Sequence, residues 1–338
     1  MDNIYIVSFT KQGAEISLKL KTLYEFATVF GKYEYENINL LNTDIKSWAA
    51  EVFNKADMII FVSALGIACR AIAPNIVAKD KDPAVIVIDD TAKFVIPLLS
   101  GHIGGANERA EEIAKFLHAV PVVTTSTDRN NKFAVDSWAV LNNLAIKDIT
   151  KIKEVSKRIL SGEQVGFYSD YVIKGERPKE LVENKNVECG IVISKDINKT
   201  IFPCSMLLIP KEYILGVGAR KNGDYTHLKS LVFRLLQENN INPLQIQAVT
   251  SIDIKKEEKA IIELAKELNV KFITYTKEQL ESIKGDFSSS SFVKNITGVD
   301  NVCERAVKCY ADSEIIVKKT SENGFTLAIG YEKWQGSF

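Results

Sequence analysis

Short apolar runs alternate with amphipathic runs through the first 140 residues, and this alternation constrains the fold more than any other feature. The runs are 4–9, 15–30, 48–54, 58–62, 84–88 and 121–125. The short apolar runs have the length of buried strands, and the amphipathic runs have the periodicity of helices. Strand–helix–strand repeats form mostly parallel sheets with helices on both faces. The sequence therefore predicts an α/β protein.

The length of 338 residues allows two or three domains. A polar stretch near residues 142–148 predicts that an N-terminal α/β domain covers 1–144. Residues 145–210 combine a helix and short strands with Lys-rich and Asn-rich loops, and we interpret them as a middle linker or lid. A second α/β domain covers 211–338. The predicted architecture is two α/β units with mostly parallel sheets flanking a smaller middle α/β segment.

Composition excludes several classes of protein. Lys plus Arg equals Asp plus Glu at 43 each, so no basic excess is present to hold nucleic acid or an anionic membrane. The N-terminus has no signal-peptide pattern and no apolar run approaches a membrane span, so we expect a cytoplasmic protein. The five cysteines include no CxxC pair, which argues against a disulfide framework and against a metal site.

The stretch 98–109 places three glycines and a histidine between an apolar run and a helical pattern. The glycines are Gly101, Gly104 and Gly105, and the histidine is His102. Glycines let a ligand approach the backbone, and the first N–H groups of a helix attract anions. A carboxylate, a phosphate or an oxyanion fits such a turn. The alternative is that these glycines only permit tight packing of the helix on the sheet.

The phosphate interpretation fails on detail. No GxxxxGK[ST] motif occurs, and the stretch 216–221 has only the first half of a GxGxxG fingerprint. A nucleotide is therefore not the favoured ligand.

Polar or glycine-containing segments follow four predicted strands of the N-terminal domain. These segments are 63–66, 89–90, 100–102 and 124–128. Ligands of parallel α/β sheets bind beyond the carboxyl ends of the strands. We therefore expect the four segments to converge on one cleft.

Together, several motifs resemble the cobalt-precorrin-5A hydrolase family of the anaerobic cobalamin (vitamin B12) pathway. In the N-terminal half the motifs are 66–74, 79–89, 98–107 and 123–128. In the C-terminal half they are the Gly216-x-Gly218 turn, 251–255, 291–293 and 298–304. The resemblance covers nearly the whole chain. Two departures are Ala219, where the family commonly has cysteine, and Ser126, where it has alanine.

The resemblance implies hydrolysis of the ring A δ-lactone of cobalt-precorrin-5A, with release of acetaldehyde, to give cobalt-precorrin-5B. This tetrapyrrole is flat and apolar with carboxylates at its rim, so it needs backbone amides and a few basic side chains. The only cobalt is the substrate's own, and no cofactor is expected. The expected substrate-binding residues are Gly66, Arg70, Lys93, Ser100, Gly101, Gly104, Gly105, Asn107, Thr125, Ser126, Thr127, Gly216, Gly218, Arg220, Lys221 and Ser251. For the basic ones, a solvated surface position is the alternative.

Lactone hydrolysis requires activated water and stabilisation of a tetrahedral oxyanion. No GxSxG elbow or HExxH helix is present, so direct attack by water is the simpler route. We assign His102 as general base or acid and the amides near Gly104 and Gly105 as oxyanion donors. Asp128 or Asp89 is expected to orient the histidine, and Glu304 is a weaker acid/base candidate.

Two other classes of function remain open at this stage. One is a non-catalytic tetrapyrrole carrier that passes intermediates between pathway enzymes, which the protein would then contact transiently. The other is a nucleotide or sugar-phosphate enzyme, which the missing phosphate-loop lysine disfavours.

Overall fold

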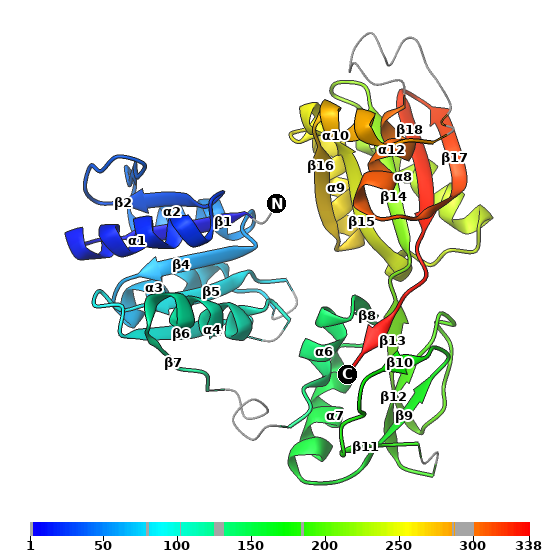
Figure 1. Cartoon of the computed structure of the whole chain (residues 1–338), viewed down its shortest axis with the longest axis horizontal. Coiled ribbons are helices and arrows are strands. Elements are labelled where there is room, and N and C mark those ends of the chain that lie inside the picture. Colours follow the sequence, from blue (N-terminus) through cyan, green and yellow to red (C-terminus); the bar gives the residue numbers. More distant parts are fainter. Residues whose placement is uncertain are drawn as a thin grey trace. The chain divides into compact units, whose positions relative to one another are not determined.

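The computed structural model describes residues 3–78, 81–101, 103–124, 132–183, 186–285, 287 and 301–338. Contacts divide the chain into two compact units, 1–137 and 138–338 (Figure 1). The helix α6 (Val135–Leu141) spans this boundary. Each unit is described by itself below.

The first unit is built on a seven-stranded sheet with the strand order β3-β2-β1-β4-β5-β6-β7. The strands are β1 (Ile4–Ser8), β2 (Thr28–Gly31), β3 (Asn39–Leu40), β4 (Met58–Val62), β5 (Ala84–Ile88), β6 (Phe94–Leu99) and β7 (Val120–Pro121). Strands β1 to β5 run parallel to one another. This confirms the predicted mostly parallel sheet.

Helices cover both faces of this sheet because its strands are apolar on both sides. They are α1 (Lys11–Leu23), α2 (Ile45–Phe53), α3 (Leu65–Ile72) and α4 (Ala106–Leu117), with a 3-10 turn at Ala73–Asn75. One buried cluster joins Ile6 of β1 to Leu20 of α1 and Ile113 of α4. The other joins Phe61 of β4 to Trp48 of α2 and α3 residues such as Ala71.

Strand β6 runs antiparallel to β5, and this overturns the expected convergence of four strand ends. Val85 pairs with Leu99, and Ile88 pairs with Val95. The segments 63–66 and 89–90 therefore lie at one edge of the sheet, whereas Ser100 lies at the other. Five residues of β5 separate the two edges by about 17 Å. The connection 89–93 is too short for a parallel crossover, which takes a dozen or more residues.

The second unit contains two five-stranded sheets. The middle sheet has the order β11-β9-β12-β13-β8, and only β8 is antiparallel to its neighbour. Its strands are β8 (Leu144–Ile146), β9 (Val165–Ser169), β11 (Leu181–Val182), β12 (Cys189–Ile193) and β13 (Cys204–Pro210). Helix α7 (Thr150–Leu160) packs on β12, β13 and β9. Val192, Phe202 and Ile209 belong to a buried cluster of this sheet.

The C-terminal sheet has the order β16-β15-β14-β18-β17, in which β14, β15 and β16 are parallel and β18 runs antiparallel to both of its neighbours, β14 and β17. Its strands are β14 (Tyr213–Ala219), β15 (Ile246–Ile252), β16 (Lys271–Tyr275), β17 (Glu314–Glu322) and β18 (Phe325–Tyr331). Its helices are α8 (Tyr225–Glu238), α9 (Lys259–Leu268), α10 (Lys277–Ser282) and α12 (Val302–Tyr310), with 3-10 turns at Pro243–Gln245 and Asp253–Lys255. Helices α8 and α9 share one buried cluster and α10 and α12 another, so both faces are covered.

The end of the chain returns from the C-terminal sheet to the middle part of the second unit, where it forms a separate two-stranded sheet (Figure 1). Strand β19 (Gly336–Ser337) pairs in parallel with β10 (Ile173–Lys174). The indole N–H of Trp138 donates to the Ser337 carbonyl at 2.7 Å, and that of Trp334 donates to the Asn142 carbonyl at 2.5 Å. These long-range bonds tie the last residues to helix α6 and to the residue that follows it.

Candidate functional site

The glycine turn lies between β6 and α4, as the sequence predicts. Ser100 begins the turn with φ of 56°, and its buried hydroxyl donates to the Asp82 carbonyl at 2.9 Å. Gly105 is the N-cap of α4 with φ of 75°, a conformation that favours glycine. The turn is therefore fixed at both ends by the backbone.

Gly104 and Gly105 serve different purposes. A Cβ on Gly104 would lie 2.5 Å from the Ser100 Cβ and 2.8 Å from the Ser100 carbonyl oxygen, so this glycine permits a close backbone approach. Among the residues that the structure describes, no atom lies within 4 Å of a Cβ placed on Gly105. Tight packing explains Gly104, whereas the left-handed backbone explains Gly105.

The first amides of α4 are already bonded, which corrects part of the expected anion site. The Ala106 N–H donates to the Ser100 carbonyl at 3.1 Å, and the Asn107 N–H donates to the Gly101 carbonyl at 3.0 Å. The Asn107 side chain also lies against Gly101, since a Cβ there would be 2.7 Å from its Oδ1. Donors for a ligand must therefore come from the turn itself rather than from these two amides.

Several predicted residues lie outside the described part of the chain. They are His102, Thr125, Ser126, Thr127 and Asp128. The described residues that precede 125–128 show the direction of the chain. Strand β7 runs parallel to β6, and the Val122 N–H donates to the Val95 carbonyl. The chain from Val122 to Thr124 thus runs toward the edge of the sheet that carries Ser100.

Four other predicted residues lie at the opposite edge, which is a correction to the sequence-based prediction. They are Gly66, Arg70, Asp89 and Lys93. The Arg70 guanidinium donates to the Gly66 carbonyl at 3.0 Å, and Lys93 Nζ lies 5.3 Å from the centre of the Phe94 ring. Asp89 therefore does not orient a side chain in the glycine turn.

Asp89 instead organises the β5–β6 hairpin. Its carboxylate accepts hydrogen bonds from the Thr91 hydroxyl, from the Thr91 N–H at 3.1 Å and from the Phe94 N–H at 2.6 Å. Burial alone would raise the pKa of Asp89, but the hydrogen bonds from Thr91 and Phe94 outweigh it and lower the pKa. The carboxylate is a turn-stabilising group.

We expect Asp89→Asn to destabilise the first unit by about 1–2 kcal/mol, because it weakens charge-assisted hydrogen bonds. A carboxyl whose folded pKa is lowered contributes stability above its unfolded pKa of about 3.9 and loses it as the pH falls through the folded pKa. The stability difference between wild type and variant should therefore shrink below about pH 4. Urea unfolding at several pH values measures this, and a pH-independent difference would contradict it.

In the C-terminal sheet, three of the six predicted site residues are buried in packing contacts. A Cβ on Gly216 would lie 1.9 Å from the Cys303 carbonyl oxygen, so α12 fills that face of β14. The buried Ser251 hydroxyl donates to the Val217 carbonyl at 2.6 Å. The buried Glu304 carboxylate accepts the Lys319 N–H at 2.7 Å. In the structure these three groups join β14, β15, α12 and β17.

The remaining three predicted residues lie at the end of β14 and in the turn that follows. A Cβ on Gly218 would lie 2.3 Å from Thr326 Oγ1. The Arg220 N–H donates to the Gly324 carbonyl at 2.9 Å. Arg220 and Lys221 are both exposed.

A buried carboxylate that the sequence did not single out joins the two sheets of the second unit. Glu212 is 2% exposed and accepts the Tyr171 hydroxyl at 3.1 Å and the Trp334 N–H at 3.0 Å. Burial, together with the charge of Glu212, raises the pKa of Tyr171. No local motif marks such a residue, because its donors come from distant segments.

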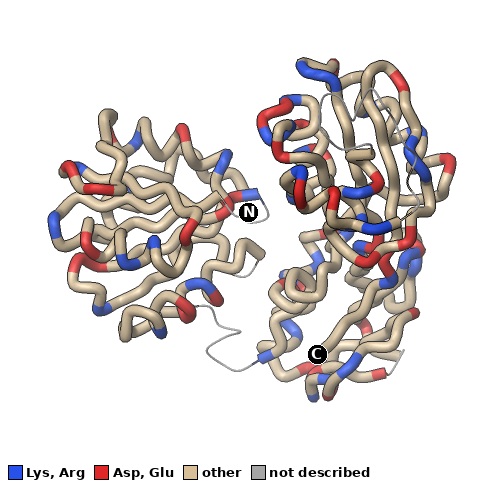
Figure 2. The backbone as a smooth tube through the Cα atoms, turned by 45° about the horizontal axis from the view of Figure 1, so that its top comes forward, with Lys and Arg blue, Asp and Glu red and all other residues tan. Residues whose placement is uncertain are grey.

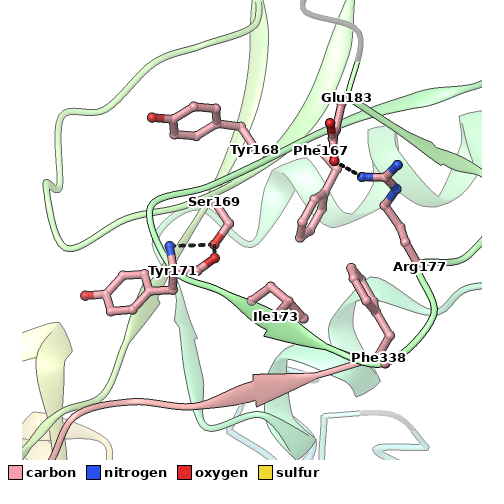
Figure 3. A pocket seen from close by; sticks show the side chains of 9 residues that line it. Phe167, Tyr168, Ser169, Tyr171, Ile173, Arg177, Glu183 and Phe338 are labelled. Carbon is pink, nitrogen blue, oxygen red and sulfur yellow. Dashed lines mark hydrogen bonds and ion pairs between the residues drawn. The ribbon is translucent and has the colours of Figure 1, made fainter.

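The middle sheet carries a cavity of about 420 Å³, although the sequence offered no chemistry there (Figure 3). The rings of Phe167 and Phe338 lie 5.2 Å apart at its wall, and Arg177 forms an ion pair with Glu183 beside them. Tyr171 also lines it. The volume is at the lower end of the range for small-molecule pockets.

Charges of both signs are interspersed along the described chain in each unit (Figure 2). In that part of the chain no cluster of three or more His, Cys, Asp or Glu side chains is arranged to hold a metal ion. Of the helices described, none combines the length and the apolar character needed to cross a bilayer.

Comparison with known proteins gives matches along most of the chain. Residues 47–128 match the model "Cobalamin synthesis G N-terminal", residues 133–210 match "Cobalamin biosynthesis central region", and residues 213–330 match "Cobalamin synthesis G C-terminus". A Salmonella typhimurium protein named cobalt-precorrin-5A hydrolase is 33% identical over 83% of this chain and 84% of its own length. A Priestia megaterium protein of the same name is 27% identical over 94% and 92%.

Proposed function

The chain belongs to the cobalt-precorrin-5A hydrolase family, and on this premise we propose that it hydrolyses the ring A δ-lactone of cobalt-precorrin-5A with release of acetaldehyde. The family places it in cobalamin biosynthesis. The observation that carries the proposal is the ordered match of all three family regions together with 33% identity over 83% of the chain. The product is cobalt-precorrin-5B, and the cobalt belongs to the substrate.

The glycine-turn edge of the first unit is the proposed reaction site. The space that the described residues leave beside Gly105 can admit a lactone carbonyl, and N–H groups of the turn at Gly104 and Gly105 would face the oxyanion. Gly101 and Asn107 shape the turn beside them. Ser100 fixes the start of the turn through its bond to Asp82, so the donors are held before the substrate arrives.

His102 is the proposed general base and acid. It takes a proton from water as the water oxygen attacks the lactone carbonyl, and it returns the proton to the ring oxygen that leaves. Asp128 orients the imidazole. The support for this pairing is that the described residues Val122–Thr124 run toward the same edge of the sheet as Ser100.

The second step breaks the bond between the bridging carbon and the macrocycle. The hydroxyl freed on that carbon loses its proton, its C–O bond becomes a carbonyl, and acetaldehyde leaves. The electron pair of the broken carbon–carbon bond passes to the macrocycle, so the chemistry resides mainly in the substrate. The chain positions the substrate and moves protons, and the proposal calls for no resident cofactor.

Carboxylates at the rim of the substrate need donors. We assign this role to the hydroxyls of Thr125, Ser126 and Thr127, which can donate to carboxylates. For the exposed residues Arg220 and Lys221 of the second unit, binding of substrate carboxylates stays a prediction.

The direct test incubates the purified chain with cobalt-precorrin-5A and follows acetaldehyde with alcohol dehydrogenase and NADH. We expect one acetaldehyde per substrate consumed, with an absorption change of the macrocycle on the same timescale. A carrier would shift the spectrum on mixing and release no aldehyde. That outcome, obtained with a folded protein, would favour the carrier over the hydrolase.

A further inference from the structure

Two cysteines lie side by side at the start of neighbouring strands in the middle sheet. Cys189 is the first residue of β12 and Cys204 the first of β13, and they are direct partners in the parallel register. Their sulfur atoms are 3.0 Å apart. Both are free thiols in the structure.

The geometry suits a covalent bond between them. Neighbouring strands are about 4.8 Å apart, which lies within the Cα separation of about 4.4–6.8 Å that disulfides span. Closing the bond moves the sulfurs together by about 1 Å, to about 2.05 Å. Side-chain rotation can supply a shift of this size, so the sheet need not rearrange.

From this juxtaposition we propose that Cys189 and Cys204 are a modification site at which hydrogen peroxide forms an intramolecular disulfide. The site is independent of the reaction proposed above. Its effect is to link β12 to β13 and to close the connection between two cysteines that are 15 positions apart.

The two thiols differ in access, which sets the order of events. Cys189 is 1% exposed, whereas Cys204 is partly exposed. Burial, together with the neighbouring Cys204 thiol, raises the pKa of the Cys189 thiol, which disfavours its thiolate. Arg158 of α7 lies close enough to lower that pKa partly, and the carboxylate of Glu154 opposes it. Cys204 is therefore the thiol that peroxide meets first.

The Cys204 thiolate attacks one peroxide oxygen, the O–O bond breaks, and the other oxygen leaves as water after taking a proton; Cys204 becomes a sulfenic acid. The Cys189 sulfur then attacks the sulfenic sulfur, the S–O bond breaks, and a second water leaves with the Cys189 proton. The two thiols lose two electrons in total, and the peroxide gains them.

The test treats the reduced full chain with one equivalent of peroxide and counts thiols after denaturation. We expect two of the five thiols to disappear and peptide mapping to find Cys189 joined to Cys204. The oxidised protein should melt about 5 °C or more above the reduced protein, since a closed loop of this size restrains the unfolded chain. Retention of alkylatable Cys189 and Cys204 after treatment would overturn the proposal.

Variants test the order of the two steps. Cys189→Ser should leave a sulfenic acid on Cys204 that dimedone traps, whereas Cys204→Ser should leave Cys189 unmodified. Cys309→Ser is the matched control, because Cys309 is another partly exposed thiol, and it should still lose two thiols. Dimedone capture on Cys189 in the Cys204→Ser protein would refute the assigned order.

Discussion

Replacing His102 with alanine is expected to lower the rate of acetaldehyde release by about a hundredfold or more, because general acid–base catalysis contributes about 10²–10⁴ to a rate. The proposal gives His102 both proton transfers of the lactone step, so the loss should fall on kcat rather than on KM. Exogenous imidazole should restore part of the activity, since it supplies the missing base without altering the backbone of the turn.

The matched control is His118→Ala. His118 ends helix α4, which begins at the glycine turn and is 12 residues long, so it lies about 18 Å from the turn along the helix. We expect this variant to keep turnover within about twofold of wild type, a difference far below the general-base contribution. Near-normal turnover of a folded His102→Ala protein would move the proton transfer to another residue, with Asp128 next to be tested.

Gly216→Ala is expected to destabilise the second unit by about 3 kcal/mol or more. The added Cβ would lie 1.9 Å from the Cys303 carbonyl oxygen and 2.8 Å from Val307 Cγ2, so helix α12 would have to move off β14. Overpacking a rigid backbone contact typically costs about 1–3 kcal/mol and sometimes more. The melting temperature of this 201-residue unit should fall by about 10 °C.

Gly218→Ala is the matched control, because it makes the same substitution two residues later on the same strand. Its Cβ would meet Thr326 Oγ1, a side-chain oxygen that can rotate away. We expect a loss below about 1 kcal/mol. If Gly216→Ala instead melts normally and loses affinity for cobalt-precorrin-5A, Gly216 faces the ligand and the packing role is refuted.

Local sequence features determined most of the secondary structure. The apolar runs at β4 (Met58–Val62) and β5 (Ala84–Ile88) form strands with the predicted bounds, and the glycine turn lies between a strand and a helix as predicted. These features depend on residues close in sequence, which is why periodicity and glycine placement reveal them. The antiparallel direction of β6 relative to β5 can also be predicted from the sequence, because the five-residue connection 89–93 is too short for a parallel crossover.

Only the tertiary structure decided which groups meet. Gly216 contacts a helix that begins 86 positions later at Val302, and Trp334 reaches back to Asn142. The residues next to a glycine in the sequence do not reveal whether it faces a ligand or a backbone carbonyl, because that contact comes from a distant segment. For Asp89, Ser251 and Glu304, polar character indicated chemistry, but their partners show that they stabilise the fold. The sequence determined where turns and strands occur, and long-range packing decided which polar groups those turns leave for a ligand.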